Sequence, residues 1–231
     1  MLIIIGVFFM LLSLAVGWRL RSRFNEYAHI PLTSGLTGKE VAEKMLRESG
    51  INNVRVTCIP GQLTDHYNPA DRTVNLSPDV YGGRSVSAAA VAAHECGHAV
   101  QHATAYRWLG FRTAMVPVTQ ISSQIMNFVF IGTLFFGFAF HSVNMNILIT
   151  IIVACQAVIT GFALVTLPVE FDASKRALVW LDRSGITHGE EHKKATHALR
   201  LAAMTYVVNA LYAVTILLYF LLSLLGGRRN N

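Results

Sequence analysis

Four long stretches of the chain contain only uncharged, mostly apolar residues. They are residues 2–18, 114–140, 143–169 and 201–225. A helix of about 20 residues, within a range of about 17 to 25, crosses the roughly 30 Å hydrocarbon core of a membrane. The pattern therefore predicts four transmembrane helices. The first is at the short end of this range, and polar residues before Asn127 place the start of the second span near Gln124.

The positive residues near the first stretch follow it, in the segment WRLRSR. A cleaved signal peptide carries its positive residues before the apolar core and a small-residue cleavage site after it. Neither feature is present here, so residues 1–18 are interpreted as a retained signal anchor.

The segment between the first two stretches alternates between helix and strand signals. In LTGKEVAEKMLRESG, Thr37 and Glu40 have the spacing of a capping box, and Gly50 ends the predicted helix. NNVRVTCI and RTVNLSP alternate like short strands. GQLTDHYNPADR, which lies between them, is rich in turn residues.

Two further helix starts are marked by hydroxyl residues. Ser85 or Ser87 can cap a long helix through VSAAAVAAHECGHAVQHATA. In THGEE, Thr187 and Glu190 repeat the capping-box spacing, and this helix is expected to continue into the fourth span.

Together these elements predict a mainly α-helical integral membrane protein with four transmembrane helices and a small α+β domain. The predicted parts are a transmembrane signal anchor at 1–18, the domain at 19–113, a transmembrane hairpin at 114–169, a polar segment with a helix at 170–200, and the last transmembrane helix with its tail at 201–231.

The formal charge of +6 is unevenly distributed along the chain. Seventeen of the Lys and Arg residues lie in the two large polar loops, two follow the last span, and HSVNMN, between the second and third spans, has none. Because cytoplasmic loops carry the excess of Lys and Arg, the large loops and the domain are predicted to face the cytosol. The sequence has no basic stripe with interleaved aromatic residues, which is the pattern that would indicate nucleic-acid binding.

Cysteine usage fits a reducing compartment. Cys58, Cys96 and Cys155 are far apart and show no paired spacing, so they are interpreted as small buried hydrophobic residues and not as disulfides.

The segment HECGH carries the clearest chemical signal. His94 and His98 are four residues apart, so on a helix they share one face and can take two corners of a tetrahedral zinc site. Glu95, rotated by about 100°, can reach a metal-bound water instead. The pattern predicts Zn²⁺ with Glu95 as the general base that activates a water to attack a peptide carbonyl.

A catalytic zinc needs a third protein ligand. On an unbroken helix His102 lies about 12 Å along the axis from His94, which is too far for it to share the metal. The topology returns Glu170 to the depth of the two histidines, which favours Glu170 with Asp172 as the alternative. A second possibility is that Glu170 is an interfacial acid paired with Lys175 or Arg176.

HECGH, the two following spans and VEFDASKRA together resemble the YugP-type family, neutral zinc metallopeptidases of bacterial membranes. The resemblance covers almost the whole chain, including the first span, DHYNP, NLSPDVY and AAMTYV. It implies a protease of the bacterial inner membrane.

The chain is also similar, more distantly, to the CAAX prenyl protease and heat-shock membrane protease group, which carries a third-ligand glutamate in E-x-x-A-D. Glu170 matches that glutamate, whereas Ser174 occupies the position of the aspartate. This departure leaves the partner of a zinc histidine open, with Asp172 as a candidate.

The sequence therefore favours a membrane-embedded zinc endopeptidase that acts on peptides or membrane proteins. In this interpretation residues 19–113 form a zincin-like catalytic domain, and residues 170–200 form a third-ligand segment and cytosolic helix. The alternatives are a non-catalytic membrane scaffold with a structural zinc and a metallohydrolase of a non-peptide amide. RTVNLSP is either an edge strand that holds the substrate backbone or an ordinary core strand. The candidates for stabilising the oxyanion are His188, His192, His197, Tyr106 and Arg200.

Overall fold

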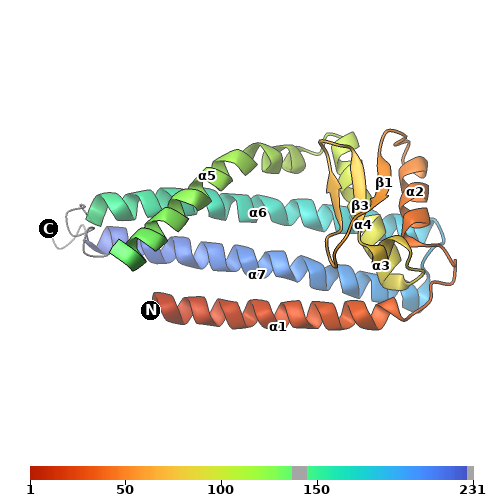
Figure 1. The fold of residues 1–231 in the computed structure, drawn as a ribbon, viewed down its shortest axis with the longest axis horizontal. Helices are drawn as coiled ribbons and strands as arrows, with labels where there is room; N and C mark the ends of the chain where they lie inside the picture. Colours follow the sequence, from red (N-terminus) through yellow and green to blue (C-terminus); the bar gives the residue numbers. More distant parts are fainter. Residues whose placement is uncertain (137–144, 228–231) are drawn as a thin grey trace. The chain divides into compact units, whose positions relative to one another are not determined.

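The computed structural model describes residues 1–136 and 145–227. The elements, in chain order, are α1 (Leu2–Ala28), α2 (Gly38–Glu48), β1 (Arg55–Cys58), β2 (His66–Asn68), β3 (Thr73–Leu76), α3 (Pro78–Tyr81), α4 (Val86–Ala103), α5 (Arg107–Phe136), α6 (Met145–Arg183) and α7 (Gly189–Gly227) (Figure 1).

These elements form two compact units. The helical unit comprises Met1–Ser13, Phe111–Leu167 and Tyr206–Asn231, and the mixed unit comprises Leu14–Gly110 and Pro168–Thr205. The long helices α1, α6 and α7 each contribute residues to both units.

Within the described residues, four helices are long and apolar enough to cross a membrane, as the hydrophobic pattern predicts. Their bounds are Leu2–Ala28, Arg107–Phe135, Met145–Arg183 and Gly189–Gly226. The second has the lowest mean hydropathy of the four, 1.3, in keeping with its polar residues. All of them extend beyond the uncharged stretches that predict them, so the helical structure does not stop where the apolar sequence stops.

In the helical unit, α6 and α7 are joined by polar contacts at a patch of small residues. Gln156 Nε2 and Thr160 Oγ1, both buried, donate to the carbonyl oxygen of Ala213 at 3.2 and 3.0 Å. Ala163, Ala210 and Ala213 form a small buried cluster beside them. Small side chains let two helices approach closely, and buried polar side chains then need partners across the interface.

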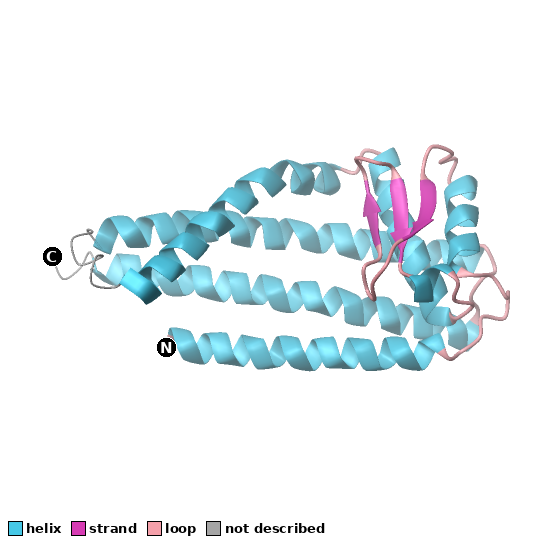
Figure 2. Ribbon diagram, in the orientation of Figure 1, coloured by secondary structure: helices cyan, strands magenta, loops and turns pink. Residues whose placement is uncertain are grey.

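The mixed unit contains a three-stranded sheet in the order β1-β3-β2 (Figure 2). β1 is parallel to β3, and β2 is antiparallel to it. The two predicted strands are confirmed, but the interpretation of RTVNLSP as an edge strand is wrong. β3 is the central strand and all four of its residues are buried. The strand at the open edge beside it is β2, which lies in the segment that the sequence predicts as turns.

One hydrophobic core packs α2 and α4 against this sheet. Its largest fully buried side chains include Met45, Leu76, Val86 and Leu181, which come from α2, β3, α4 and α6. Most positions of α4 are alanine or other small residues and are buried, so this helix runs through the middle of the mixed unit. The residues of HECGH are therefore held rigidly by packing on several sides.

The helix caps agree with the sequence at two of three positions. Thr37 and Glu40 form the expected capping box, and Gly50 has a positive φ of 73° after α2 ends. Ser85 caps α4 by accepting a hydrogen bond from the Ala88 N–H. The capping box at Thr187 is wrong, because α7 begins at Gly189 and the Thr187 hydroxyl bonds with His192 Nδ1 instead. The continuation of this helix into the fourth span is confirmed.

The three cysteines are free, and two of them match their interpretation. Cys96 and Cys155 are buried, whereas Cys58 is exposed at the end of β1. Burial raises the pKa of the Cys96 thiol well above its usual range, so this thiol stays protonated. Its sulfur lies 3.6 Å from the carbonyl oxygen of Ala42, within the core. Cys96 is therefore a buried packing residue.

Candidate metal centre

The two histidines of HECGH lie side by side on α4. His94 and His98 are separated by one helical turn, and their ring centroids are 4.8 Å apart. Their side chains are only 14% and 12% exposed. Most of α4 around them is apolar, so each imidazole needs a polar partner in place of water.

The structure brings Glu170, from α6, to these two histidines. Its Oε2 lies 3.4 Å from His94 Nε2 and 3.6 Å from His98 Nε2. The three residues form a group whose candidate ligand atoms all lie within 4.8 Å of one another. Glu170 is buried and faces the histidines, and Arg176, one of the two partners considered for an interfacial acid, contacts Asp172 instead.

The donor set and its spacing fit a zinc ion. Ligand atoms around a tetrahedral zinc with bonds of about 2.1 Å lie about 3.4 Å apart, close to the two distances from Glu170. Two imidazole nitrogens and a carboxylate oxygen are also ligands that zinc accepts. The three side chains are thus grouped closely enough to hold one cation together.

The electrostatics of the site favour positive charge at this point. Burial alone lowers the pKa of His98, but its hydrogen bond with Glu170 and the charges of Glu95 and Glu170 outweigh it and raise this pKa above the usual value. The same negative field stabilises a bound cation.

Gly97 allows α4 and α6 to approach closely enough to form the group. A Cβ built at Gly97 would lie 2.5 Å from the carbonyl oxygen of Ala173 and 3.1 Å from its carbonyl carbon and Cα. These are backbone atoms of α6, which cannot move aside as a flexible side chain can. The glycine next to His98 is thus needed for Glu170, three residues before Ala173, to reach the histidines.

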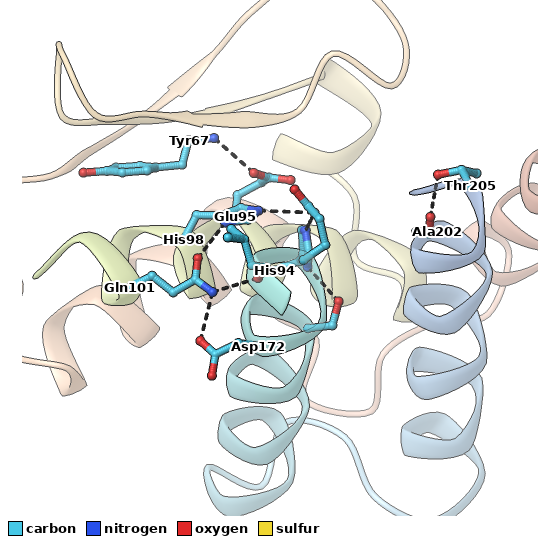
Figure 3. Close-up of polar contacts among 11 residues, drawn as sticks. Tyr67, His94, Glu95, His98, Gln101, Asp172, Ala202 and Thr205 are labelled. Atoms are coloured by element: carbon cyan, nitrogen blue, oxygen red, sulfur yellow. Dashed lines mark hydrogen bonds and ion pairs between the residues drawn. The ribbon is translucent and has the colours of Figure 1, made fainter. Parts of the chain in front are cut away.

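Glu95 occupies a different face of α4 and is held by the sheet. It is buried, and its Oε2 accepts a hydrogen bond of 3.0 Å from the backbone N–H of Tyr67 in β2 (Figure 3). Tyr67 is the middle residue of this edge strand. The carboxylate is therefore fixed in orientation beside the histidines by a strand that the sequence did not predict.

The remaining ring nitrogens of the two histidines contact polar side chains. His94 Nδ1 lies 3.1 Å from Ser174 Oγ, and His98 Nδ1 lies 3.0 Å from Gln101 Oε1 (Figure 3). Ser174 thus contacts His94 from α6. The prediction that Asp172 takes over this contact is wrong, since Asp172 meets Gln101 and not an imidazole.

His102 lies away from the group, as its helical position predicts. Its Nδ1 hydrogen-bonds with the hydroxyl of Tyr67 at 2.8 Å, and the two rings pack against each other with centroids 5.9 Å apart. His102 thus supports the residue whose backbone holds Glu95. The sequence identified His102 as a non-ligand but gave no indication of its tyrosine partner.

The five candidates for stabilising an oxyanion have mostly other neighbours. His188 is exposed near Asp182, and His197 hydrogen-bonds with the Tyr27 hydroxyl at 2.7 Å. The other three are placed as follows: His192 contacts Thr187, Tyr106 lies beneath the Arg176 guanidinium, and Arg200 is exposed on α7. All five residues therefore stay candidates for stabilising an oxyanion.

A cavity of about 660 Å³ lies along the N-terminal half of α4. Its walls come from α1, α3, α4 and the loop before β2, and they include Phe24, Leu63, Asp65 and Val91. Val91 is one turn before Glu95 on α4, and Asp65 is two residues before Tyr67. The cavity therefore lies next to the helix face and the strand edge that hold Glu95.

Comparisons with known proteins show which family the chain belongs to. Residues 2–225 match the model of a family described as "Putative neutral zinc metallopeptidase". The chain belongs to this family. It is also 38% identical over 220 residues to the "Putative membrane protease YugP" of Bacillus subtilis (strain 168). The matched region covers 95% of each chain. No solved structure matches the chain. This membership confirms the family resemblance of the sequence.

Replacing Gly97 with alanine should separate α4 from α6. The added methyl group would overlap backbone atoms of Ala173, and such overpacking costs about 1–3 kcal/mol. We expect Gly97→Ala to lower both the thermal stability of the detergent-purified protein and its zinc content after dialysis against a chelator. Gly110→Ala on α5 is the control, because no atom lies within 4 Å of its added Cβ. Equal zinc retention in the two variants would contradict the close approach of the helices.

Proposed function

We propose that this member of the family is a membrane-embedded zinc endopeptidase. The observation that carries the proposal is the convergence of His94, His98 and Glu170 at one point, with Glu95 on the same helix beside them. A site that only stabilises the fold usually fills all four zinc positions with Cys or His. Three ligands with an adjacent glutamate leave one position for a reacting molecule.

In this proposal His94 and His98 bind zinc through Nε2, and Glu170 binds it through its carboxylate. When bound, zinc supplies Lewis acidity, which lowers the pKa of water to about 7 and polarises a substrate carbonyl. The ligands are already gathered in a buried pocket, so little reorganisation is needed to form the site.

Glu95 takes the proton of the attacking water. Its Oε2 is held by the Tyr67 N–H, which leaves Oε1 as the atom that accepts the proton and later passes it to the leaving amine. A fixed carboxylate avoids the cost of orienting the base at the moment of reaction. The buried position of Glu95 also keeps bulk water from competing for its charge.

An extended peptide is the substrate shape that this site favours. β2 has β3 on one side only, and its other edge carries the Tyr67 N–H that reaches Glu95. A peptide that lies along that edge passes directly beside the base, while the Tyr67 N–H stays bonded to Glu95. The cavity lined by Leu63 and Val91 then receives the residues of the substrate that flank the cleaved bond. The substrate backbone is therefore assigned to β2, in place of RTVNLSP.

The site faces the cytosol in this proposal, and the four apolar helices span the bacterial inner membrane. This orientation rests on the excess of Lys and Arg in the two large polar loops. The residues of α1 that line the cavity lie between Arg21 and Ala28, about 5 to 15 Å along the helix from Trp18, the last residue of the first stretch. Peptide segments close to the membrane surface are thus within reach of the cavity.

Glu95→Gln tests the enzymatic part of the proposal. We expect this variant to bind zinc like the wild type, since Glu95 is not a ligand, and to lose about 10²–10⁴-fold in turnover because the base is gone. The measurement is metal analysis together with cleavage of a broad set of membrane-protein and peptide substrates. Glu43→Gln, an exposed change on α2, is the control and should cleave normally. Wild-type cleavage by Glu95→Gln would exclude Glu95 as the base.

The ligand set is tested by zinc competition with a chelator. Glu170→Ala should lower zinc affinity strongly, and Glu170→His should restore part of it because imidazole also suits zinc. Asp172→Ala should cost about 10–100-fold, the usual effect of losing an indirect partner of a ligand. Asp182→Ala, an exposed change on the same helix, is the control. If Asp172→Ala empties the site and Glu170→Ala does not, the two residues exchange roles.

The orientation is tested with reporter fusions. Fusions ending after Arg23 and Lys193 should read as cytosolic, and one within HSVNMN, residues 141–146, should read as external. Most of this hairpin lies outside the described residues, so the experiment also supplies its location. An external signal after Arg23 would place the metal site on the opposite side of the membrane.

A further inference from the structure

Gln101 is a fully buried polar residue, one turn after His98 on α4. Its side chain makes three hydrogen-bond contacts: with His98 Nδ1 at 3.0 Å, with the carbonyl oxygen of Val169 at 2.8 Å and with Asp172 Oδ2 at 2.9 Å (Figure 3). These partners lie on α4 and α6. A buried amide with this many partners is fixed in position and not free to rotate.

The orientation of this amide follows from the chemistry of its partners. The Val169 carbonyl and the Asp172 carboxylate can only accept hydrogen bonds, so the –NH₂ group of Gln101 has to face them. The reverse orientation would place three oxygen atoms against each other. The Gln101 carbonyl oxygen therefore faces His98 Nδ1.

The orientation of the amide in turn determines where the proton of His98 lies. An amide oxygen can only accept, so Nδ1 of His98 has to carry hydrogen. In the neutral imidazole the lone pair is then on Nε2, the atom that lies 3.6 Å from Glu170 Oε2. The partners of Gln101 on α6 thus set the tautomer of a histidine on α4.

The anchor on α6 is itself held in place. Arg176 Nε donates to Asp172 Oδ2 at 2.6 Å, and the guanidinium lies over the Tyr106 ring at 5.6 Å. Asp172 therefore stays available as an acceptor for the Gln101 amide.

We infer that Gln101 is the positioning residue of the zinc site. Its carbonyl oxygen accepts a hydrogen bond from the Nδ1–H of His98 and, because the amide is held by Val169 and Asp172, keeps the Nε2 lone pair toward the metal. This inference rests on the zinc site of the proposed function, and it does not depend on peptide cleavage. Gln101 acts through His98, so its effect is on the affinity and orientation of a ligand.

Two substitutions of opposite design test this role. Gln101→Met keeps the length of the side chain but removes the acceptor, so we expect zinc affinity to fall about 10–100-fold at pH 7. Gln101→Glu keeps an oxygen acceptor opposite His98 Nδ1, so we expect zinc affinity within about threefold of the wild type, because a carboxylate partner supports a zinc-bound histidine at least as well as an amide does.

The order of the two variants separates positioning from packing. If Gln101 served only to join α4 and α6, Gln101→Glu would be the worse variant, since it adds a second carboxyl beside Asp172 and loses the –NH₂ donor. The thermal stability of the metal-free protein should therefore be lower in Gln101→Glu than in Gln101→Met. Zinc affinity, in contrast, should be lower in Gln101→Met than in Gln101→Glu. Gln156→Met is the matched control, because Gln156 is also buried and donates to a backbone carbonyl but contacts no histidine.

The measurement is competition for zinc between the detergent-purified full chain and a chelator of known affinity. Wild-type affinity in Gln101→Met overturns the inference, as does a loss greater than tenfold in Gln101→Glu. If Gln101→Met does not fold, Gln101→Glu alone decides by the same criterion. Failure of the wild type to bind zinc would instead refute the proposed function, so the two failures are distinguishable.

Discussion

The backbones of α4 and α6 meet at Gly97, where there is no room for even one methyl group. This contact places the histidines of one helix opposite the glutamate of the other, and it places Gln101 opposite Val169 and Asp172. A wider separation of the two helices would move the glutamate away from the histidines and Gln101 away from its partners on α6. The rest of the mixed unit, including the sheet and α2, packs around α4 and keeps this contact closed.

The site concentrates buried polar groups in a core of small apolar residues. Burying an ionisable group without a partner costs several kcal/mol, so each such group here has a specific contact. Glu95 is bound to a strand, His94 to Ser174, and His98 to Gln101. The arrangement is a network in which the partners of the candidate metal ligands are as fixed as the candidate ligands themselves. Such rigidity favours binding a metal in one geometry.

Sequence patterns predicted the parts of the molecule that depend on local order. Long uncharged stretches identified the four apolar helices, and the spacing of His94 and His98 identified one face of a helix. Glu170 could also be predicted as a candidate ligand, because two predicted spans lie between it and the histidines and bring the chain back to their side of the membrane. Asp172 was assigned the wrong contact, since the sequence cannot show that a buried glutamine lies between it and the imidazole.

The features that the sequence did not predict depend on contacts between distant segments. β2 has only three residues within a turn-rich segment, and it becomes a strand because β3 pairs with it. RTVNLSP is central and not at an edge for the same reason. The close approach at Gly97 and the contacts of Gln101 likewise involve α6, more than 60 residues later in the chain. A glutamine one turn after the second histidine, on the same face of the predicted helix, is the signal in the sequence that could have indicated Gln101.

The crowding of these functions into two turns of α4 has a consequence for how the protein matures. His94, Glu95, His98 and Gln101 acquire their mutual positions as soon as this helix forms, which is a local and fast event. The Gln101–Asp172 contact, in contrast, closes a loop of 71 residues that contains two of the apolar helices. Closing such a loop comes late in assembly. The newly made chain therefore lacks Glu170 beside His94 and His98 until the segment between α4 and Glu170 is in place.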